Sequence, residues 1–326
     1  MIEAARYLEL GPDFYAEVMP QALRNPRLHV HDAATARACG LSEFELSFNP
    51  WLALFSGQQV PAHCRPLAQV YAGHQMGKFN PSLGDGRVLL LGEIDHAGRR
   101  RELSIKGAGP TPYSRHADGV AGLSECLQEF DLSRTVRAAG IPVVDCLCVI
   151  SGEEQVDRKG FERRAILVRS APSLLRFGTF EHFYAQGEHA NSQRLADYLL
   201  RWHFPECAAQ AQPYAALFAE IVRRTAILIG LWQLNGFTHG MLNTDNQSLL
   251  GLTLDLGESS FNPTRAPDYV SSPRDKQARY AFGNQPAVGL WNCNALARAM
   301  SPLIEQTQLK QALQLYEPQL LAITGS

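Results

Sequence analysis

Short apolar runs in the first half of the chain predict a small antiparallel sheet built from two hairpins. Each pair of runs is separated by a polar, turn-forming segment, at 96–101 in the first pair and at 152–162 in the second. The first pair is preceded by Gly84-Asp-Gly86, a strong turn signal. The predicted strands are 88–91, 102–106, 143–151 and 164–168.

Helical periodicity takes over in the second half of the chain. One helix is predicted earlier, over 122–139, from apolar residues at Leu123, Leu127, Phe130 and Val136. The remaining predicted helices cover 192–204, 213–237 and 287–300, with another beginning at 301–302. The pattern therefore predicts an α+β fold with a sheet-containing lobe followed by a mainly helical lobe.

The 326 residues, 45% of them hydrophobic, are enough to bury a large core and favour two lobes. We expect an N-terminal extension over 1–60 that wraps the next lobe, a nucleotide-binding lobe over 61–170, and a helical lobe over 171–326. The net charge of −2 argues against nucleic acid or an anionic membrane as a partner. No bilayer-spanning stretch or secretory signal is recognised, so the cytoplasm is the expected compartment.

The seven cysteines are scattered, and none forms a Cys-x-x-Cys pair. This pattern argues against a disulfide framework or a zinc site. Cys146 and Cys148 lie two positions apart in a predicted strand, so we expect them to be packed thiols on one face.

The segment 237–257 carries the polar residues that point most clearly to chemistry. Asp245 and Asn246 stand side by side in a polar turn. The apolar run 249–254 is short enough to be a buried hairpin, and it leads into Asp255. Two carboxylates and an amide oxygen form a hard ligand set, which suits Mg²⁺ or Mn²⁺ carrying a nucleotide phosphate.

This segment parallels the protein-kinase arrangement, in which an Asn and a later Asp-x-Gly hold the metals. If His239-Gly-Met241 is laid on the kinase His-Arg-Asp, Asn246 falls on the metal-binding Asn and Asp255 on the Asp of Asp-Phe-Gly. Met241 then occupies the position of the catalytic base and cannot accept a proton. Asp245 is the nearest replacement. The alternative is a turn held by its own side-chain to backbone bonds.

A second group of candidates surrounds Lys106, which ends the first hairpin and precedes the Gly-rich segment 107–119. Such a segment can offer backbone N–H groups and a positive charge to phosphate, although it matches neither a Walker A loop nor a Rossmann fingerprint. Glu129 lies mid-helix, where a kinase-like lobe would pair it with the strand lysine. Arg169 and Arg176 suit bidentate phosphate contacts. The alternatives are an ordinary Gly/Pro turn, a solvated glutamate and two surface arginines.

Six strings spread over nearly the whole chain resemble the selenoprotein O family. They are Ala-Gly-His-Gln at 72–75, Leu-Gly-Asp-Gly-Arg at 83–87, Lys-Gly-Ala-Gly-Pro-Thr-Pro-Tyr-Ser-Arg at 106–115, Leu-Arg-Phe-Gly at 175–178, His-Gly-x-x-Asn-Thr-Asp-Asn at 239–246 and Tyr-Ala-Phe-Gly-Asn-Gln-Pro at 280–286. The resemblance implies a protein-kinase-like, pseudokinase fold. It also implies transfer of AMP from ATP to Ser, Thr or Tyr hydroxyls of proteins, with the nucleotide flipped so that the α-phosphate is attacked.

The resemblance also implies roles for individual residues. Lys106 would hold phosphate and be positioned by Glu129, Asn246 and Asp255 would bind Mg²⁺ or Mn²⁺, and Asp245 would accept the proton. The nucleotide site as a whole would comprise Gly84, Gly86, Arg87, Lys106, Asp118, Gly119, Glu129, Arg169, Arg176 and Asp255. UMP transfer from UTP stays open, whereas Met241 disfavours a kinase that moves the γ-phosphate.

The chain departs from the family pattern at several places. Val120 and Ser124 stand where the family usually has arginines, and Met76 stands where it usually has Phe. Family members run on well beyond the last residue here, so part of the helical lobe and the C-terminal redox motif of some members are expected to be missing. A truncated, non-catalytic nucleotide-binding pseudokinase is therefore the alternative function.

Overall fold

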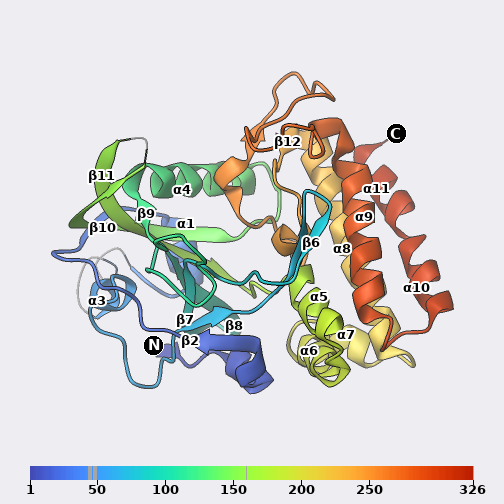
Figure 1. Ribbon diagram of the computed structural model, residues 1–326, viewed down its shortest axis with the longest axis horizontal. Coiled ribbons are helices and arrows are strands. Elements are labelled where there is room, and N and C mark those ends of the chain that lie inside the picture. The colour runs from blue at the N-terminus through green and yellow to red at the C-terminus, as the bar shows by residue number, and fades with distance from the viewer. Residues whose placement is uncertain (43–45, 47–49, 159, 326) are drawn as a thin grey trace. The chain divides into compact units, whose positions relative to one another are not determined.

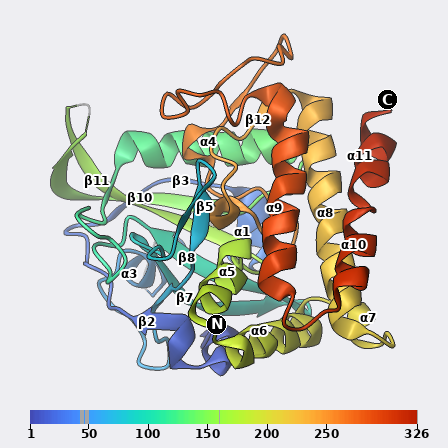
Figure 2. The same cartoon turned by 45° about the vertical axis from the view of Figure 1, so that its right-hand side comes forward.

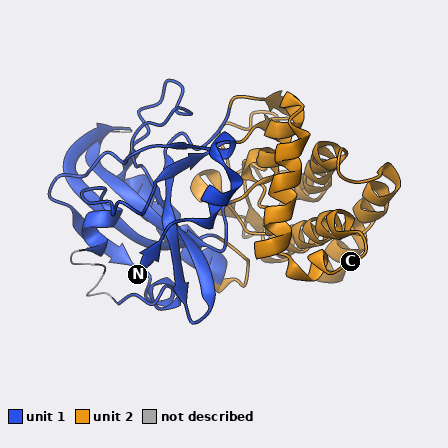
Figure 3. Cartoon of the chain, turned by 90° about the horizontal axis from the view of Figure 1, so that it is seen from below, with its two compact units in different colours: residues 1–70, 83–137, 144–174 blue, residues 71–82, 138–143, 175–326 orange. Residues whose placement is uncertain are grey.

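The computed structural model describes residues 1–42, 46, 50–158 and 160–325 (Figure 1). The chain forms two compact units (Figure 3). The first comprises 1–70, 83–137 and 144–174, and the second 71–82, 138–143 and 175–326. The second unit thus takes in two short pieces from within the first half of the sequence. The three-part division at 60 and 170 remains a prediction.

Among the described residues, the first unit contains a nine-stranded antiparallel sheet with the order β2-β4-β7-β8-β11-β10-β3, in which β1 pairs with β7 and β9 with β11. Helices α1 (Ala33–Ala38), α3 (Trp51–Phe55) and α4 (Leu123–Ala138) accompany it. The strands are β1 (Ile2–Glu3), β2 (Tyr15–Glu17), β3 (Arg27–His31), β4 (Leu67–Gln69), β7 (Val88–His96), β8 (Arg99–Lys106), β9 (Ala121–Gly122), β10 (Asp145–Asp157) and β11 (Phe161–Ala171).

Both predicted hairpins are confirmed, but their turns are shorter than expected. β7 and β8 pair as far as His96 and Arg99, so the turn is reduced to two residues. The polar segment 152–162 was predicted as a turn, and this is wrong. Gln155 pairs with Arg163, and Val156 with Glu162. Exposed Glu153, Gln155 and Asp157 alternate here with buried Gly152 and Val156, so the polar side chains occupy the side of the pleat that faces water.

The two faces of the sheet pack against different layers. One face meets α4 through a cluster that includes Phe130 and Cys146, and the other meets N-terminal segments through a cluster that includes Phe55 and Cys148. The expectation that Cys146 and Cys148 share a face is therefore wrong. The β10–β11 register shifts between these two cysteines, and a bulge of this kind breaks the two-residue alternation. Both are buried thiols, as predicted.

A buried carboxyl group is built into the first sheet. Glu102 on β8 lies opposite Glu93 on β7 and accepts hydrogen bonds from Ser173 Oγ (2.9 Å) and the Leu174 N–H (2.8 Å). Burial raises the pKa of Glu102 to about 8, and the nearby charge of Glu93 acts in the same direction. Burial therefore favours the neutral form of the Glu102 carboxyl.

The second unit is mainly helical, and α8 runs alongside α9 and α11 (Figures 1 and 2). Helix α8 begins with Pro213 in its first turn and ends at Gly236, whose positive φ of 69° suits a C-terminal cap. The helices are α5 (Phe177–Gln186), α6 (His189–Trp202), α7 (Pro205–Ala208), α8 (Pro213–Asn235), α9 (Gln285–Met300), α10 (Gln306–Leu313) and α11 (Tyr316–Thr324). Two small hairpins complete it, β5 (Gly73–Gln75) with β6 (Lys78–Asn80) and β12 (Phe237–Thr238) with β13 (Ser260–Phe261).

The α+β class is confirmed, as are the three long predicted helices of the second half. The helix expected to begin at 301–302 is wrong, since α10 begins only at Gln306. Ser301 instead ends α9, donating from its hydroxyl to the Arg298 carbonyl (2.8 Å). Among the described helices, none combines the length and apolarity that crossing a membrane requires.

Candidate active site

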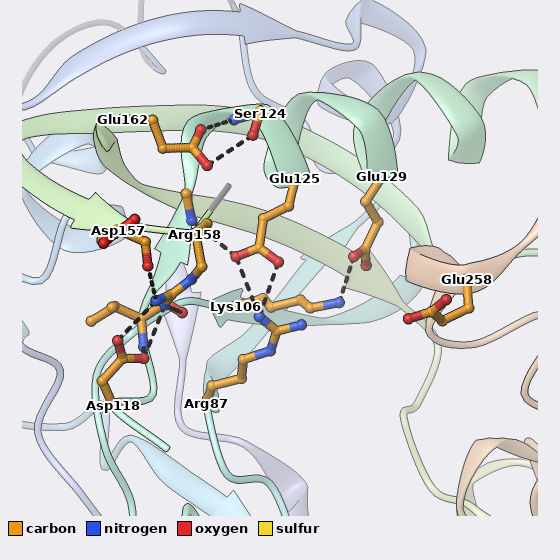
Figure 4. A network of polar contacts seen from close by, with 12 residues as sticks. Arg87, Lys106, Asp118, Ser124, Glu125, Glu129, Asp157, Arg158, Glu162 and Glu258 are labelled. Atoms are coloured by element: carbon orange, nitrogen blue, oxygen red, sulfur yellow. Dashed lines mark hydrogen bonds and ion pairs between the residues drawn. The ribbon is translucent and has the colours of Figure 1, made fainter. Parts of the chain in front are cut away.

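In the first unit, the strand lysine and the helix glutamate meet as expected. Lys106 ends β8, and its ammonium donates to Glu129 Oε2 on α4 (Figure 4). Arg169 on β11 places Nη1 3.8 Å from Glu129 Oε1. All three side chains are buried. Glu129 is therefore no solvated helix residue and Arg169 no surface arginine. Cations held in a buried cluster with defined geometry are suited to binding a phosphate.

Arg87 lies beside this cluster and is held by a glutamate that sequence reasoning missed. Its Nη1 is 3.2 Å from Glu125 Oε2, with both side chains half-exposed (Figure 4). Glu125 precedes Glu129 by one helical turn, so α4 presents two carboxylates on one face. This i, i+4 spacing was the available signal. The Glu125 carboxylate therefore already contacts Nη1 of the arginine that was predicted to line the nucleotide site.

The Gly-rich segment does not form the expected backbone cradle for phosphate. The N–H groups of Gly107 and Ala108 both donate to the Arg87 carbonyl (2.8 and 3.3 Å), and the Gly109 N–H donates to Gly119 O (3.0 Å). These amides are committed inside the loop because the chain folds back on itself there. These three N–H groups are therefore not available to a phosphate.

The other predicted glycines serve close packing. A Cβ on Gly84 would overlap the ring of Tyr113, and one on Gly86 would lie 3.1 Å from the Tyr113 carbonyl oxygen. Gly119 packs against the backbone of Gly109, and its φ is 69°. These positions require glycine for steric reasons, whether or not they also line a nucleotide.

Asp118 lies in an exposed part of the same loop, where Arg158 holds it. Two guanidinium nitrogens of Arg158 bond to the two carboxylate oxygens at 3.0 Å each (Figure 4). This contact holds the pKa of Asp118 below its usual range. Arg158 directly follows the end of β10, whose last residues the sequence suggested were a turn, so its approach to Asp118 could not be foreseen.

In the second unit, Arg176 ties the candidate catalytic loop together. Its Nη1 donates to the Asp245 carbonyl (2.8 Å) and lies 3.3 Å from Asp255 Oδ2. The guanidinium also stacks 4.4 Å from the ring centroid of Tyr71. Arg176 is buried, which excludes the surface alternative. One guanidinium therefore links the two predicted carboxylate positions.

Asp245 has the properties of a reactive carboxylate. It is only 6% exposed, and burial raises its pKa to about 6 despite the Gln75 hydrogen bond and the charge of Arg176. Gln75 Nε2 donates to Asp245 Oδ2 (3.0 Å), whereas Oδ1 has no hydrogen-bond partner among the described residues. A buried acceptor without a partner is costly, so Oδ1 is suited to meeting a ligand. Gly73 lies against it, since a Cβ there would be 2.6 Å from Oδ1.

Asn246 and Asp255 have features that fit a divalent metal. Asn246 Nδ2 donates to the Met241 carbonyl (2.9 Å), which leaves the amide oxygen as the atom that can accept a cation. This bond also shows that the turn does use side-chain to backbone contacts, as the alternative supposed. Within the described ranges, no group of three or more His, Cys, Asp or Glu side chains is arranged for a metal. One or two protein ligands completed by substrate phosphates is the usual Mg²⁺ pattern.

The predicted hairpin at 249–254 is reduced to a single antiparallel bridge between Gln247 and Thr253, with no regular strand on either side of the turn. Ser248 also bridges to Arg176, and Thr253 to Val143. The segment therefore pairs with its neighbours as well as with itself. Asp255, which follows it, has a left-handed φ of 52°. Strain of this kind concentrates at functional sites.

Sequence reasoning also missed the residues that hold the Asp245 loop in place. The β5–β6 hairpin donates to it from the His74 N–H to Thr244 Oγ1 (2.7 Å) and from the Met76 N–H to Asn243 Oδ1 (3.2 Å). Tyr280 Oη also donates to Asn243 Oδ1 (2.5 Å). His74 and Tyr280 belong to the strings at 72–75 and 280–286, and Met76 directly follows the first of these, but the strings alone indicate no role for them.

A buried strand lysine paired with a helix glutamate, and a buried Asp-Asn turn followed by a second Asp, define a protein built on kinase-type site elements. The chain belongs to the protein adenylyltransferase SelO family, whose model matches residues 3–322. This confirms the resemblance found in the sequence.

Curated relatives agree with the family assignment. The chain is 45% identical over 316 residues to the protein nucleotidyltransferase YdiU of Vibrio cholerae, covering 97% of this chain and 64% of the relative. It is 44% identical over 318 residues to YdiU of Aliivibrio salmonicida, covering 97% and 66%. The chain therefore spans just under two thirds of the length of these relatives.

Among solved structures, ROP2 from Toxoplasma gondii, described as having a protein-kinase fold and no enzymatic activity, matches with a TM-score of 0.34. It is 11% identical and covers 79% of this chain and 82% of that one. A TM-score below 0.5 is too low to establish a shared arrangement.

Proposed function

We propose that this chain transfers AMP from ATP to Ser, Thr or Tyr hydroxyls of proteins. In this reaction the acceptor oxygen attacks the α-phosphorus and forms a new P–O bond. The bond from the α-phosphorus to the α,β-bridging oxygen breaks, pyrophosphate leaves, and the acceptor proton passes to Asp245. The observation that carries the proposal is the buried Oδ1 of Asp245, which has no partner among the described residues. Asp245 is followed by Asn246, and the guanidinium that holds its main-chain carbonyl also contacts the Asp255 carboxylate.

Asp245 is the proposed proton acceptor because Met241, at the kinase base position, has no basic group. Gln75 and the Gly73 backbone fix the carboxylate from one side, and Arg176 fixes the loop through the Asp245 carbonyl. An acceptor hydroxyl would hydrogen-bond to Oδ1, the oxygen that has no other partner among the described residues. Such prior positioning supplies much of the rate enhancement in phosphate transfers.

Asn246 and Asp255 are the proposed protein ligands of Mg²⁺ or Mn²⁺. When bound, the metal neutralises phosphate charge and favours departure of pyrophosphate. The contact of Asp255 with Arg176 and the bond from Asn246 to Met241 orient these two side chains before metal arrives.

In the first unit, Lys106 and Arg169 are the proposed phosphate-binding cations, with Glu129 as the residue that orients them. Arg87 is the proposed third cation. It exchanges the Glu125 carboxylate for phosphate, which the half-exposed position of that pair allows.

The test is a paired incubation of this chain and acceptor proteins with α-labelled or γ-labelled ATP and Mg²⁺ or Mn²⁺. Metal-dependent label from the α-position, lost in Asp245→Asn and Asp255→Asn, is the expected result. Label from the γ-position would instead identify a kinase. ATP binding by calorimetry without any transfer would identify a nucleotide-binding pseudokinase. A parallel incubation with α-labelled UTP tests the donor.

A further inference from the structure

The second unit contains a cavity of about 830 Å³ that no role described so far explains. It is lined by residues of the β5–β6 hairpin, α5 and α9. The lining residues that matter are His74, Phe79, Glu181, Tyr184 and Arg298. A cavity of this size can hold several side chains or a short peptide segment.

The cavity wall is bonded directly to the Asp245 loop. Glu181 Oε1 lies 2.5 Å from His74 Nδ1, and Glu181 Oε2 accepts a hydrogen bond from Thr244, the residue before Asp245. The His74 N–H also donates to Thr244 Oγ1 (2.7 Å). Two residues of the cavity wall, His74 and Glu181, are therefore bonded to the residue that precedes the proposed proton acceptor.

Two exposed aromatic residues lie at the cavity: Phe79 lines it, and Trp291 packs against His74 of its wall. The Phe79 side chain is 41% exposed and that of Trp291 38%, and each ring centroid is 5.1 Å from that of His74. Large aromatic residues gathered on a surface next to a cavity are typical of protein-binding sites, because they offer apolar area at low entropic cost.

The charges around the cavity favour an anionic group. Glu181 is buried and already bonded to His74 and Thr244. The exposed Arg298 guanidinium lies 5.9 Å from the centroid of the Tyr184 ring, and it pairs with no carboxylate in the part of the chain that the structure describes. The Arg298 side chain thus lines the cavity with a positive charge that neither Glu181 nor another described carboxylate pairs with.

We propose that this cavity is the docking pocket for the acceptor protein, taking an acidic side chain near the modified hydroxyl against Arg298 and apolar side chains against Phe79 and Trp291. The proposal rests on the proposed AMP transfer and adds the chemistry of the acceptor segment. Because the pocket would bind the acceptor segment while other residues hold the nucleotide, a change in the pocket should alter the KM for the acceptor and leave the KM for ATP unchanged.

The test uses positional-scanning peptide libraries with a central Ser, Thr or Tyr, in which one flanking position at a time is Asp, Ala or Lys. Transfer from α-labelled ATP is measured for the wild-type chain, Arg298→Glu, and Lys310→Glu as a matched control on an exposed helix position outside the cavity. We expect about a fivefold preference for Asp at one or two fixed positions, the size of an exposed ion pair. Arg298→Glu should reverse it in favour of Lys, and Lys310→Glu should leave it unchanged.

The wild-type chain, Arg298→Glu and Lys310→Glu should have equal KM values for ATP and equal thermal unfolding temperatures. Such equality would show that the reversed charge preference comes from the pocket and not from a change in folding or nucleotide binding. Transfer without charge preference, or a preference that survives Arg298→Glu, would overturn the docking pocket and leave the proposed function intact. Label on intact proteins but on no peptide would overturn it too, since the cavity should accept an isolated segment. A dimer that dissociates in Arg298→Glu, with no peptide preference, would assign the surface to a second copy. No transfer onto any acceptor would remove the proposed function itself.

Discussion

A single methyl group at Gly73 should disable Asp245 without altering its charge. A Cβ at Gly73 would lie 2.6 Å from Asp245 Oδ1 and 2.8 Å from Asp245 Cβ. Carbon atoms in contact prefer about 3.5 Å, so Gly73→Ala must displace the side chain or the hairpin by roughly 0.7 Å. A misplacement of about 1 Å at a catalytic group costs on the order of 100-fold in rate. We therefore expect kcat for AMP transfer to fall between about 10- and 100-fold, which corresponds to about 1.4 to 2.7 kcal/mol.

The assay is the initial rate of transfer from α-labelled ATP, measured over a range of ATP concentrations. The KM for ATP should stay within about twofold, because only interactions made in the transition state are lost. Gly257→Ala is the matched control, since a Cβ there meets nothing within 4 Å. Full kcat in Gly73→Ala, with normal folding, would refute the reasoning, because Asp245 would then either tolerate displacement or not be the proton acceptor.

Three further outcomes follow from the described contacts. Glu129→Gln removes the carboxylate partner of buried Lys106, so the free energy of unfolding, measured with urea, should fall by about 3 kcal/mol. A fall of less than about 1 kcal/mol would contradict a buried ion pair. Gln75→Leu removes the donor to Asp245 and should lower kcat about tenfold at unchanged ATP KM, whereas a pure rise in KM would count against it. For Glu102, burial raises the folded pKa from 4.5 to about 8, so stability should fall as pH rises through this interval, by up to about 1.4 kcal/mol per pH unit. Urea unfolding from pH 5 to 8 should show this slope and its loss in Glu102→Gln.

The contacts of the first unit were predictable where regular elements carry them. Lys106 ends a strand marked by its apolar run, and Glu129 lies inside a helix marked by its periodicity. The strand that carries Lys106 and the helix that carries Glu129 are close in the chain, so only a few packing arrangements are available to the two side chains. The extension of β10 and β11 past the core was not predictable from polarity, because exposed strand ends and turns have the same polar composition.

The arrangement around Asp245 was predictable only in part. The Asp-Asn turn and the later Asp255 could be identified because they are close in sequence. The β5–β6 hairpin that fixes them could not, since His74 and Thr244 are 170 positions apart. The sequence contained the string at 72–75, yet local pattern carries no information about which loop a hairpin will cover. Only the packed structure shows why position 73 has no room for a side chain: the Asp245 side chain lies against it.

Glycine explains why the predicted phosphate cradle failed. A Gly-rich segment serves equally well to expose amides to a ligand or to let two chain segments approach closely. The sequence cannot distinguish the two, because what decides is where the amide hydrogens point. Here the Gly107 and Ala108 N–H groups donate to Arg87 O, and Gly84 packs on Tyr113. With those amides committed, the proposed phosphate contacts of the first unit rest on the side-chain cations. In that proposal, the exchange of Glu125 for phosphate at Arg87 affects how tightly the nucleotide binds.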